Sequence, residues 1–376
     1  MDADLVIDAG RNLDISATIT ANTAEITAGK DLKLNTTMNV ASAVLTAGNN
    51  IKYTVPFLSA AANGTLLSAP SNGRSLALNE PALTLDLLGG GVNPLALNGG
   101  NAAGLSLFEG GNGGTFIAGD ATDPIAGNIA INAPINATTG ANGALVATGG
   151  NGGKVSLNSD KTVTVNSTVK VSDSAAGKAS KRGGNISLTS NNTSGTAIKV
   201  TNSGQLLALL SNAAPGPGGS IKFASAGGDI SMSGTAKADR GTVEITNSGD
   251  AGKVNLTNAT LHGDVVKAGA LGNNGTLNIG GGTIDADTAI KLYAGGSSGT
   301  VNFTNNVTLS GTSVKTIAGD TVTIYNGKIV TINGSGPASV FTNNPNYTGS
   351  GGNGSTTGVF GGQGAITQSL SKAPGY

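Results

Sequence analysis

Cysteine and tryptophan are absent from this 376-residue chain, and aromatic residues make up only 3% of it. Without cysteine, disulfides, thiol catalysis and cysteine-ligated zinc are excluded. Charged residues make up 11%, against a typical ~25%, and the formal net charge is zero. The densest basic segment runs only from Lys178 to Arg182, so nucleic acid is not an expected partner.

Long hydrophobic runs are also missing, so the sequence predicts no transmembrane segment. The opening MDADLVIDAG has neither the positive region nor the apolar stretch of a signal peptide. It leads directly into a strand pattern with no segment to cover the first strand edge. We therefore expect this chain to be a fragment of a longer protein, or to carry a false start at Met1.

What the chain does contain is a repeat near its start. The segments 7–15 (IDAGRNLDI), 26–34 (ITAGKDLKL) and 45–53 (LTAGNNIKY) follow one another at an equal step. A fixed period of this length is typical of a solenoid. Apolar and polar residues alternate within each copy, which indicates short strands with one buried face. A repeat with two or three such strands predicts one turn of a parallel β-helix, with neighbouring coils ~4.8 Å apart.

Two aligned positions of the repeat carry further expectations. Gly10, Gly29 and Gly48 share one position, where we expect a turn with positive φ, which glycine adopts at little cost. Asn12, Asp31 and Asn50 share another, where we expect a polar ladder beside the core.

A second phrase, glycine followed by alternating aliphatic and polar residues, continues the pattern. It starts at residues 127, 153, 184, 219, 241, 252, 275 and 299. The fold class predicted is all-β, a single-stranded parallel β-helix. We divide it into four segments: regular 19-residue coils (1–53), coils with irregular loops (54–126), coils of about 22–24 residues with insertions (127–335), and a loosely ordered Gly/Ser/Asn-rich tail (336–376). Segment 205–210 (QLLALL) fits a short helix or a strand, and we favour the strand. The insertions near 89–124 and 172–184 are expected to form exposed loops.

The phrases AGRNLDI, AGKDLKL and AGNNIKY, with the later glycine-led phrases, resemble filamentous-haemagglutinin-like exoproteins. These are passengers of two-partner secretion and autotransporter systems in Gram-negative bacteria. The resemblance covers most of residues 1–335 and implies a right-handed β-helix that acts as a rod-like adhesin or structural passenger, without enzymatic activity. It also implies an extracellular or outer-surface location. The implied partners are glycans or proteins of host or neighbouring cells, and an outer-membrane transporter during export. The family's secretion signature is not matched, since 93–96 (NPLA) departs from it.

A β-helix can also be a carbohydrate-active enzyme, such as a polysaccharide lyase or hydrolase, which needs clustered carboxylates with Arg, Lys or His. Asp285 and Asp287, with Lys291 near them, are the closest candidates, and we interpret them as outward-facing, solvated turn carboxylates. His262 is the sole histidine, with Asp264 as its one nearby ligand, and is interpreted as a surface turn residue. We therefore assign no catalytic, metal or cofactor-binding residue and expect no cofactor.

Two further patterns remain open. GGNGG at 110–114 and 149–153 approaches the calcium-binding nonapeptide, but Thr115 and Lys154 stand where its aspartate is needed. Thr162/Thr164 and Thr321/Thr323 form Thr-x-Thr pairs, which are interpreted as outward β-formers. A flat, regular threonine face would favour a third function, a self-associating scaffold that binds glycan or ice. A groove lined with Asp, Lys and Arg would favour the enzyme.

Overall fold

The computed structural model describes residues 3–53, 58–65, 67–69, 71–85, 95–102, 109–139, 149–171, 180–210, 217–325, 330–333, 338–342 and 366–369. These residues form strands and turns and contain no helix, so none of them belongs to a helix that could cross a membrane. The chain divides into two compact units, one of residues 1–188 with 205–220 and one of residues 189–204 with 221–376.

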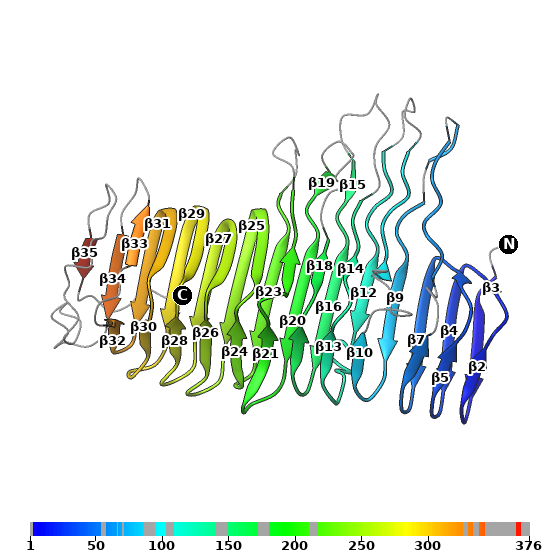
Figure 1. Cartoon of the computed structure of the whole chain (residues 1–376), viewed down its shortest axis with the longest axis horizontal. Coiled ribbons are helices and arrows are strands. Elements are labelled where there is room, and N and C mark those ends of the chain that lie inside the picture. Colours follow the sequence, from blue (N-terminus) through cyan, green and yellow to red (C-terminus); the bar gives the residue numbers. More distant parts are fainter. Residues whose placement is uncertain are drawn as a thin grey trace. The chain divides into compact units, whose positions relative to one another are not determined.

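In the first unit, strands from successive coils lie side by side and pair in parallel (Figure 1). One series consists of β1 (Leu5–Ala9), β4 (Thr23–Ala28), β7 (Ser42–Ala47), β9 (Ser75–Asn79), β12 (Thr115–Ala118) and β16 (Lys154–Ser159). Others are β2 (Leu13–Ile15), β5 (Leu32–Leu34) and β8 (Ile51–Tyr53); β3 (Ile19–Thr20) and β6 (Met38–Asn39); β10 (Leu83–Leu85), β13 (Ile129–Ile131) and β17 (Val163–Val165); β11 (Leu95–Ala96), β14 (Ile135–Asn136), β18 (Thr168–Lys170) and β22 (Gln205–Leu207); and β15 (Gly149–Asn151) and β19 (Ser180–Arg182).

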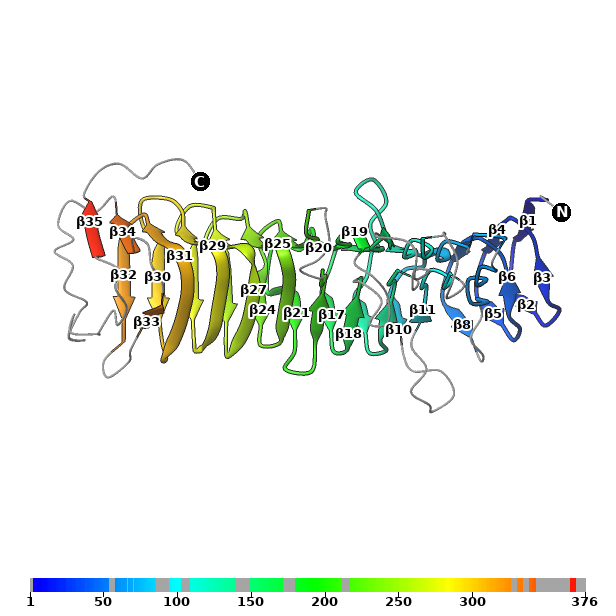
Figure 2. The same cartoon turned by 90° about the horizontal axis from the view of Figure 1, so that it is seen from above.

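The second unit has two main series of strands, which Figure 2 shows from a second direction. The first consists of β21 (Thr196–Val200), β24 (Asp229–Met232), β26 (Lys253–Leu256), β28 (Thr276–Ile279), β30 (Thr300–Phe303) and β32 (Thr321–Ile324). The second consists of β25 (Thr235–Asn247), β27 (Ala259–Ala270), β29 (Gly282–Ala294), β31 (Val307–Ala318), β33 (Val330–Asn333), β34 (Ala338–Thr342) and β35 (Ile366–Ser369). β20 (Asn185–Ser190) and β23 (Ser220–Ser225) cross the division between the units.

Strand registers show how much chain each coil uses. β1, β4 and β7 pair at one constant step, with Leu5 beside Ala24 and Ala24 beside Ala43, as the repeat predicts. The step then lengthens, so that Ser42 pairs with Ser75 and Ser75 with Thr115. In the second unit the coils are shorter again and nearly uniform in length.

The core is thin and aliphatic, because alternate side chains turn inward along the strands whose side chains the structure describes. β5 and β10 show the pattern buried–exposed–buried, and inward Leu, Ile and Val side chains are almost completely buried. Phe116 and Phe223 are the largest of the fully buried side chains. Buried polar groups sit where a coil turns: Asn247 is 0% exposed and donates from Nδ2 to the carbonyls of Gly228 (2.9 Å) and Lys253 (3.2 Å).

The parallel, all-β solenoid predicted from the sequence is therefore confirmed. The polar ladder is also confirmed: the Asp31 amide donates to Asn12 Oδ1 and Asn50 Nδ2 donates to Asp31 Oδ1, both at 3.3 Å. Of the strand preferred for QLLALL, the structure forms the first half, β22, and residues 208–210 lie outside any strand. The four predicted segments divide the chain by coil length, whereas the two compact units divide it by contacts. The segment boundaries therefore stay a prediction.

The expected reason for the repeated glycine was wrong. Gly10, Gly29 and Gly48 are not among the residues with positive φ. A Cβ on Gly29 would instead lie 2.5 Å from the carbonyl oxygen of Gly10, and one on Gly48 would lie 2.3 Å from that of Gly29. Close contact between stacked coils, rather than turn conformation, therefore requires glycine at this position.

Several predicted features lie outside the described residues. They are residues 89–94 and 103–108 within the first predicted loop region, residues 172–179 within the second, and residues 336–337, 343–365 and 370–376 of the tail. The segment 93–96 is described only at β11.

Candidate functional sites

In the second unit, side chains of the same type line up in columns from coil to coil. Four consecutive coils place a threonine at one outward position, Thr235, Thr260, Thr283 and Thr308, all paired in register. The backbone of Thr331 continues this register in the next coil. On the other strand series, Thr276, Thr300 and Thr321 also pair in register. Because neighbouring coils lie ~4.8 Å apart, each column presents hydroxyl groups at a regular spacing.

Asparagines form a second kind of column beside the shorter threonine column. Asn278 Nδ2 donates to Asn255 Oδ1 at 2.8 Å, and Asn302 Nδ2 donates to Asn278 Oδ1 at 3.0 Å. Thr323 follows Asn302 in register. The outward side of β26, β28, β30 and β32 is therefore a small grid of hydroxyl and amide groups, in which the pair Thr321/Thr323 is one row.

A basic column lies on the longer strands. Lys267, Lys291 and Lys315 pair in register on β27, β29 and β31, after Glu244 on β25. The Lys267 ammonium lies 3.7 Å from the Glu244 carboxylate. Lys291, which the sequence suggested as a neighbour of Asp285 and Asp287, is thus flanked by the lysines of the coils before and after it.

Charged side chains also gather where β25, β27 and β29 bend. His262 Nδ1 lies 2.9 Å from Asp285 Oδ2, and Nε2 lies 3.4 Å from Asp239 Oδ1, so carboxylates from the two neighbouring coils flank the ring. The Lys237 ammonium lies 3.4 Å from Asp239. At the bend itself the Thr288 hydroxyl donates to Asp264 Oδ1.

This arrangement corrects the sequence-based interpretation of His262 and Asp285. Both lie within long strands rather than turns, and His262 is 24% exposed. Asp285 and Asp287 do face outward, as expected. Asp264, expected as the nearest metal ligand of His262, instead accepts a hydrogen bond from Thr288, and the residues that reach the ring come from other coils. Among the described residues no group of His, Asp and Glu is arranged to hold a metal ion.

The two GGNGG segments form an asparagine ladder in the first unit. The Asn112 amide donates to Asn72 Oδ1 at 3.0 Å, and the Asn151 amide donates to Asn112 Oδ1 at 2.6 Å. Thr115 and Lys154, which replace the calcium-binding aspartate, pair with each other as the first residues of β12 and β16. The glycines that follow each asparagine permit this close stacking, because a Cβ on Gly114 would lie 2.1 Å from the Arg74 carbonyl oxygen.

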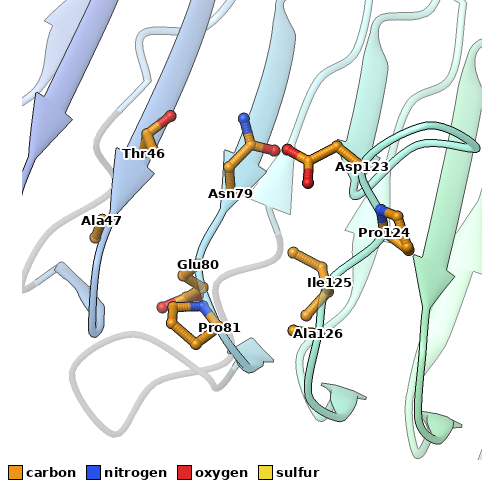
Figure 3. A pocket seen from close by; sticks show the side chains of 9 residues that line it. All are labelled: Thr46, Ala47, Asn79, Glu80, Pro81, Asp123, Pro124, Ile125 and Ala126. Atoms are coloured by element: carbon orange, nitrogen blue, oxygen red, sulfur yellow. The ribbon is translucent and has the colours of Figure 1, made fainter.

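A pocket of about 240 Å³ opens in the first unit (Figure 3). Its walls come from the end of β7, from the segment after β9 and from the turn before β13. The lining residues are Thr46, Ala47, Asn79, Glu80, Pro81, Asp123, Pro124, Ile125 and Ala126. Figure 3 shows the side chains of Asn79 and Asp123 meeting at one end of the pocket, with Glu80 and Pro81 at the other. Two carboxylic acids therefore share one cavity.

Glu80 is 8% exposed and completes a main-chain ladder. In the first two coils, the amides of Leu13 and Leu32 donate to main-chain carbonyls of the following coil, each at 2.9 Å. In the third coil the Ile51 amide donates to Glu80 Oε2 instead, at 2.8 Å. Burial raises the pKa of Glu80 to about 7, and the hydrogen bond from Ile51 opposes that rise.

Sequence reasoning missed Glu80 and Asp239. Glu80 follows an alternating strand and precedes Pro81, and nothing in that pattern shows that an irregular coil returns it to Ile51. Asp239, His262 and Asp285 follow one another at an equal step, which is a detectable signal once the coil length is known. A comparison with protein-family models, with curated proteins and with solved structures finds no match to this chain.

Proposed function

We propose that this chain is a non-enzymatic, β-helical segment of a secreted or cell-surface bacterial exoprotein, and that it serves as an adhesin or structural passenger. The proposal places it outside the cell, exported through an outer-membrane transporter, with glycans or proteins of another cell surface as partners. It draws on the resemblance of AGRNLDI, AGKDLKL and AGNNIKY to filamentous-haemagglutinin-like exoproteins.

The observation that carries the proposal is the column of four outward threonines from Thr235 to Thr308, together with the shorter Thr276–Thr321 column. A surface that repeats the same polar group coil after coil suits contact with an extended, repetitive polymer. Each single contact is weak, and several in register add up through multivalency. A binding function of this kind needs neither a deep pocket nor an activated nucleophile.

The test is binding of the purified chain to a glycan array and to intact cells, before and after the cells are treated with glycosidase or protease. The informative variant is Thr260→Val with Thr283→Val, which retains shape and β propensity and removes two adjacent hydroxyls. Thr27→Val with Thr164→Val, two outward threonines of the first unit, is the matched control. Loss of binding in the first pair alone supports the proposal. Release of reducing ends or unsaturated products from a polysaccharide would contradict it and favour the enzyme.

The threonine and asparagine grid on β26, β28, β30 and β32 favours a second candidate, a scaffold that binds ice or glycan. Its regular two-dimensional spacing is set by strand geometry along one axis and by coil stacking along the other. Measurement of ice recrystallisation with wild type and with Thr300→Lys tests the ice-binding form. Ice crystals that grow equally with and without the wild-type protein would rule out ice binding.

A further inference from the structure

The pocket around Glu80 holds two carboxyl groups, and its described walls provide no positive charge to balance them when they are ionised. Glu80 and Asp123 both line it, and the nine lining residues include no Lys, Arg or His. Among the described residues, the hydrogen bond that reaches Glu80 comes from the Ile51 amide, which is a neutral donor. A carboxylate buried without a cationic partner is destabilised by the loss of its hydration, so a cation that enters the pocket is stabilised there.

The remaining lining is suited to a small ligand with an apolar face and polar edges. Pro81, Pro124 and Ile125 supply apolar surface, and Thr46 and Asn79 supply a hydroxyl and an amide. A cavity of about 240 Å³ has room for a single sugar ring or the end of a long side chain.

Asp123 is held in place before any ligand arrives. The amides of Thr122 and Asp123 donate to Asp120 Oδ1 at 2.7 and 2.8 Å, and the Asp120 amide donates back to the Asp123 carbonyl at 3.0 Å. Pro124 then fixes the next φ angle. Since this turn is closed on itself, the backbone that carries Asp123 has little conformational entropy left to lose on binding.

We propose that this pocket binds a protonated primary amine, with Glu80 as the buried counter-charge and Asp123 as a second carboxylate at the opposite end. The ammonium supplies the positive charge that the described walls lack and pairs with Glu80, while other polar groups of the ligand find acceptors in Asp123 and Asn79 at the opposite end. Two sources carry this chemistry, an amino sugar and the side chain of a lysine. The proposal does not rest on the adhesin function, since the pocket lies in the first unit and the threonine columns lie in the second.

The experiment is a titration of the full chain with paired probes, followed by isothermal calorimetry and by chemical-shift changes of the Ile51 and Asp123 amides. Glucosamine is compared with N-acetylglucosamine and glucose, and Nα-acetyl-lysine amide is compared with its Nε-acetylated form. We expect each amine that fits to bind at least tenfold more tightly than its neutral analogue. Comparison of the sugar probes with the lysine probes then shows whether the pocket takes an amino sugar or a lysine side chain.

Variants separate binding from folding. Glu80→Gln keeps an acceptor for the Ile51 amide and removes the charge, and Asp123→Asn changes the other carboxylate at the pocket's opposite end. Each is expected to weaken amine binding at least tenfold, whereas Glu25→Gln, an exposed glutamate on β4, leaves it unchanged. Equal affinity for amines and neutral analogues, or unaltered affinity in both pocket variants, would overturn the proposal. Threonine-column variants that lose cell binding but keep amine binding would show that the two functions are independent.

Discussion

The carbonyl oxygen of Gly10 lies 2.5 Å from the point that a Cβ on Gly29 would occupy. The two residues hold the same position in consecutive coils, and the Gly29 amide donates to the Ala9 carbonyl at 2.7 Å. The coil spacing at this point is therefore set by main chain resting on main chain.

Replacement of Gly29 by alanine is expected to lower the free energy of unfolding by about 1–3 kcal/mol, as overpacking does, because a backbone atom cannot move aside without shifting the coil. Urea unfolding monitored by far-UV circular dichroism measures the change. Gly10→Ala is the matched control, since no described atom lies within 4 Å of its Cβ, and about 0.5 kcal/mol or less is expected. Equal losses in the two variants would show that conformational freedom, rather than contact, is what matters.

Glu80 is expected to make stability depend on pH. Its folded-state pKa of about 7 lies above its ordinary value of 4.5, so the folded protein binds more protons between these values than the unfolded chain does. The contribution of Glu80 is therefore fully present below pH 4.5 and is lost as the pH rises through 7. The total is about 3 kcal/mol, because one pKa unit corresponds to about 1.4 kcal/mol.

The Glu80→Gln variant removes this titration while retaining an acceptor for Ile51. Relative to wild type, its free energy of unfolding is expected to be larger at pH 8 than at pH 4.5 by about 3 kcal/mol, so that the variant is relatively more stable at the higher pH. Unfolding in urea at both pH values measures it, with the exposed Glu25→Gln as the control. A constant difference between variant and wild type across this range would refute the assignment.

Asn247 is expected to be the most sensitive asparagine of the second unit. Its side chain is fully buried, donates to two carbonyls, and accepts from the Gly249 amide at 3.1 Å. Asn247→Ala leaves these buried groups unpaired, at about 2–4 kcal/mol in total. Asn302→Ala, which removes one half-buried bond to Asn278, should cost about 1 kcal/mol or less. Thermal unfolding of both variants gives the comparison, and similar midpoints would contradict this prediction.

The ion pairs of His262 are expected to contribute little to stability. The partner Asp285 is 46% exposed, and pairs of this exposure contribute about 0–1 kcal/mol. A double-mutant cycle of His262→Ala with Asp285→Asn should therefore give a coupling below about 1 kcal/mol that shrinks in about 1 M salt. Asp287→Asn, on the same strand, is the control for a loss of surface charge. A coupling of several kcal/mol would mean that the ring is buried more deeply than its 24% exposure indicates.

Prediction from sequence succeeded where a pattern is local and repeats. The alternation in Leu32–Leu34 and the fixed step of the repeat each identify one coil without knowledge of any other residue, and β5 and the β4–β7 register follow them. Asn12, Asp31 and Asn50 could be predicted to meet because regular coils place equal positions over one another.

Prediction from sequence failed for side-chain contacts between coils of unequal length. The distance in sequence between Ile51 and Glu80 is 29 residues, which matches no repeat of the chain, and their hydrogen bond arises from one irregular coil. His262 was expected in a surface turn, but coil stacking continues β27 through that point.

The amino-acid sequence by itself determined that this protein is a β-helix. Alternating apolar residues give each strand one face to bury, and a fixed period buries these faces by stacking the strands of successive coils in parallel. Tertiary structure alone decided which side chains of different coils meet: the threonine columns, the carboxylates on either side of His262, and the pocket that joins Glu80 to Asp123. The physical reason is that residues of different coils meet only when the coils stack. Which residues then face each other depends on the length of every turn between them.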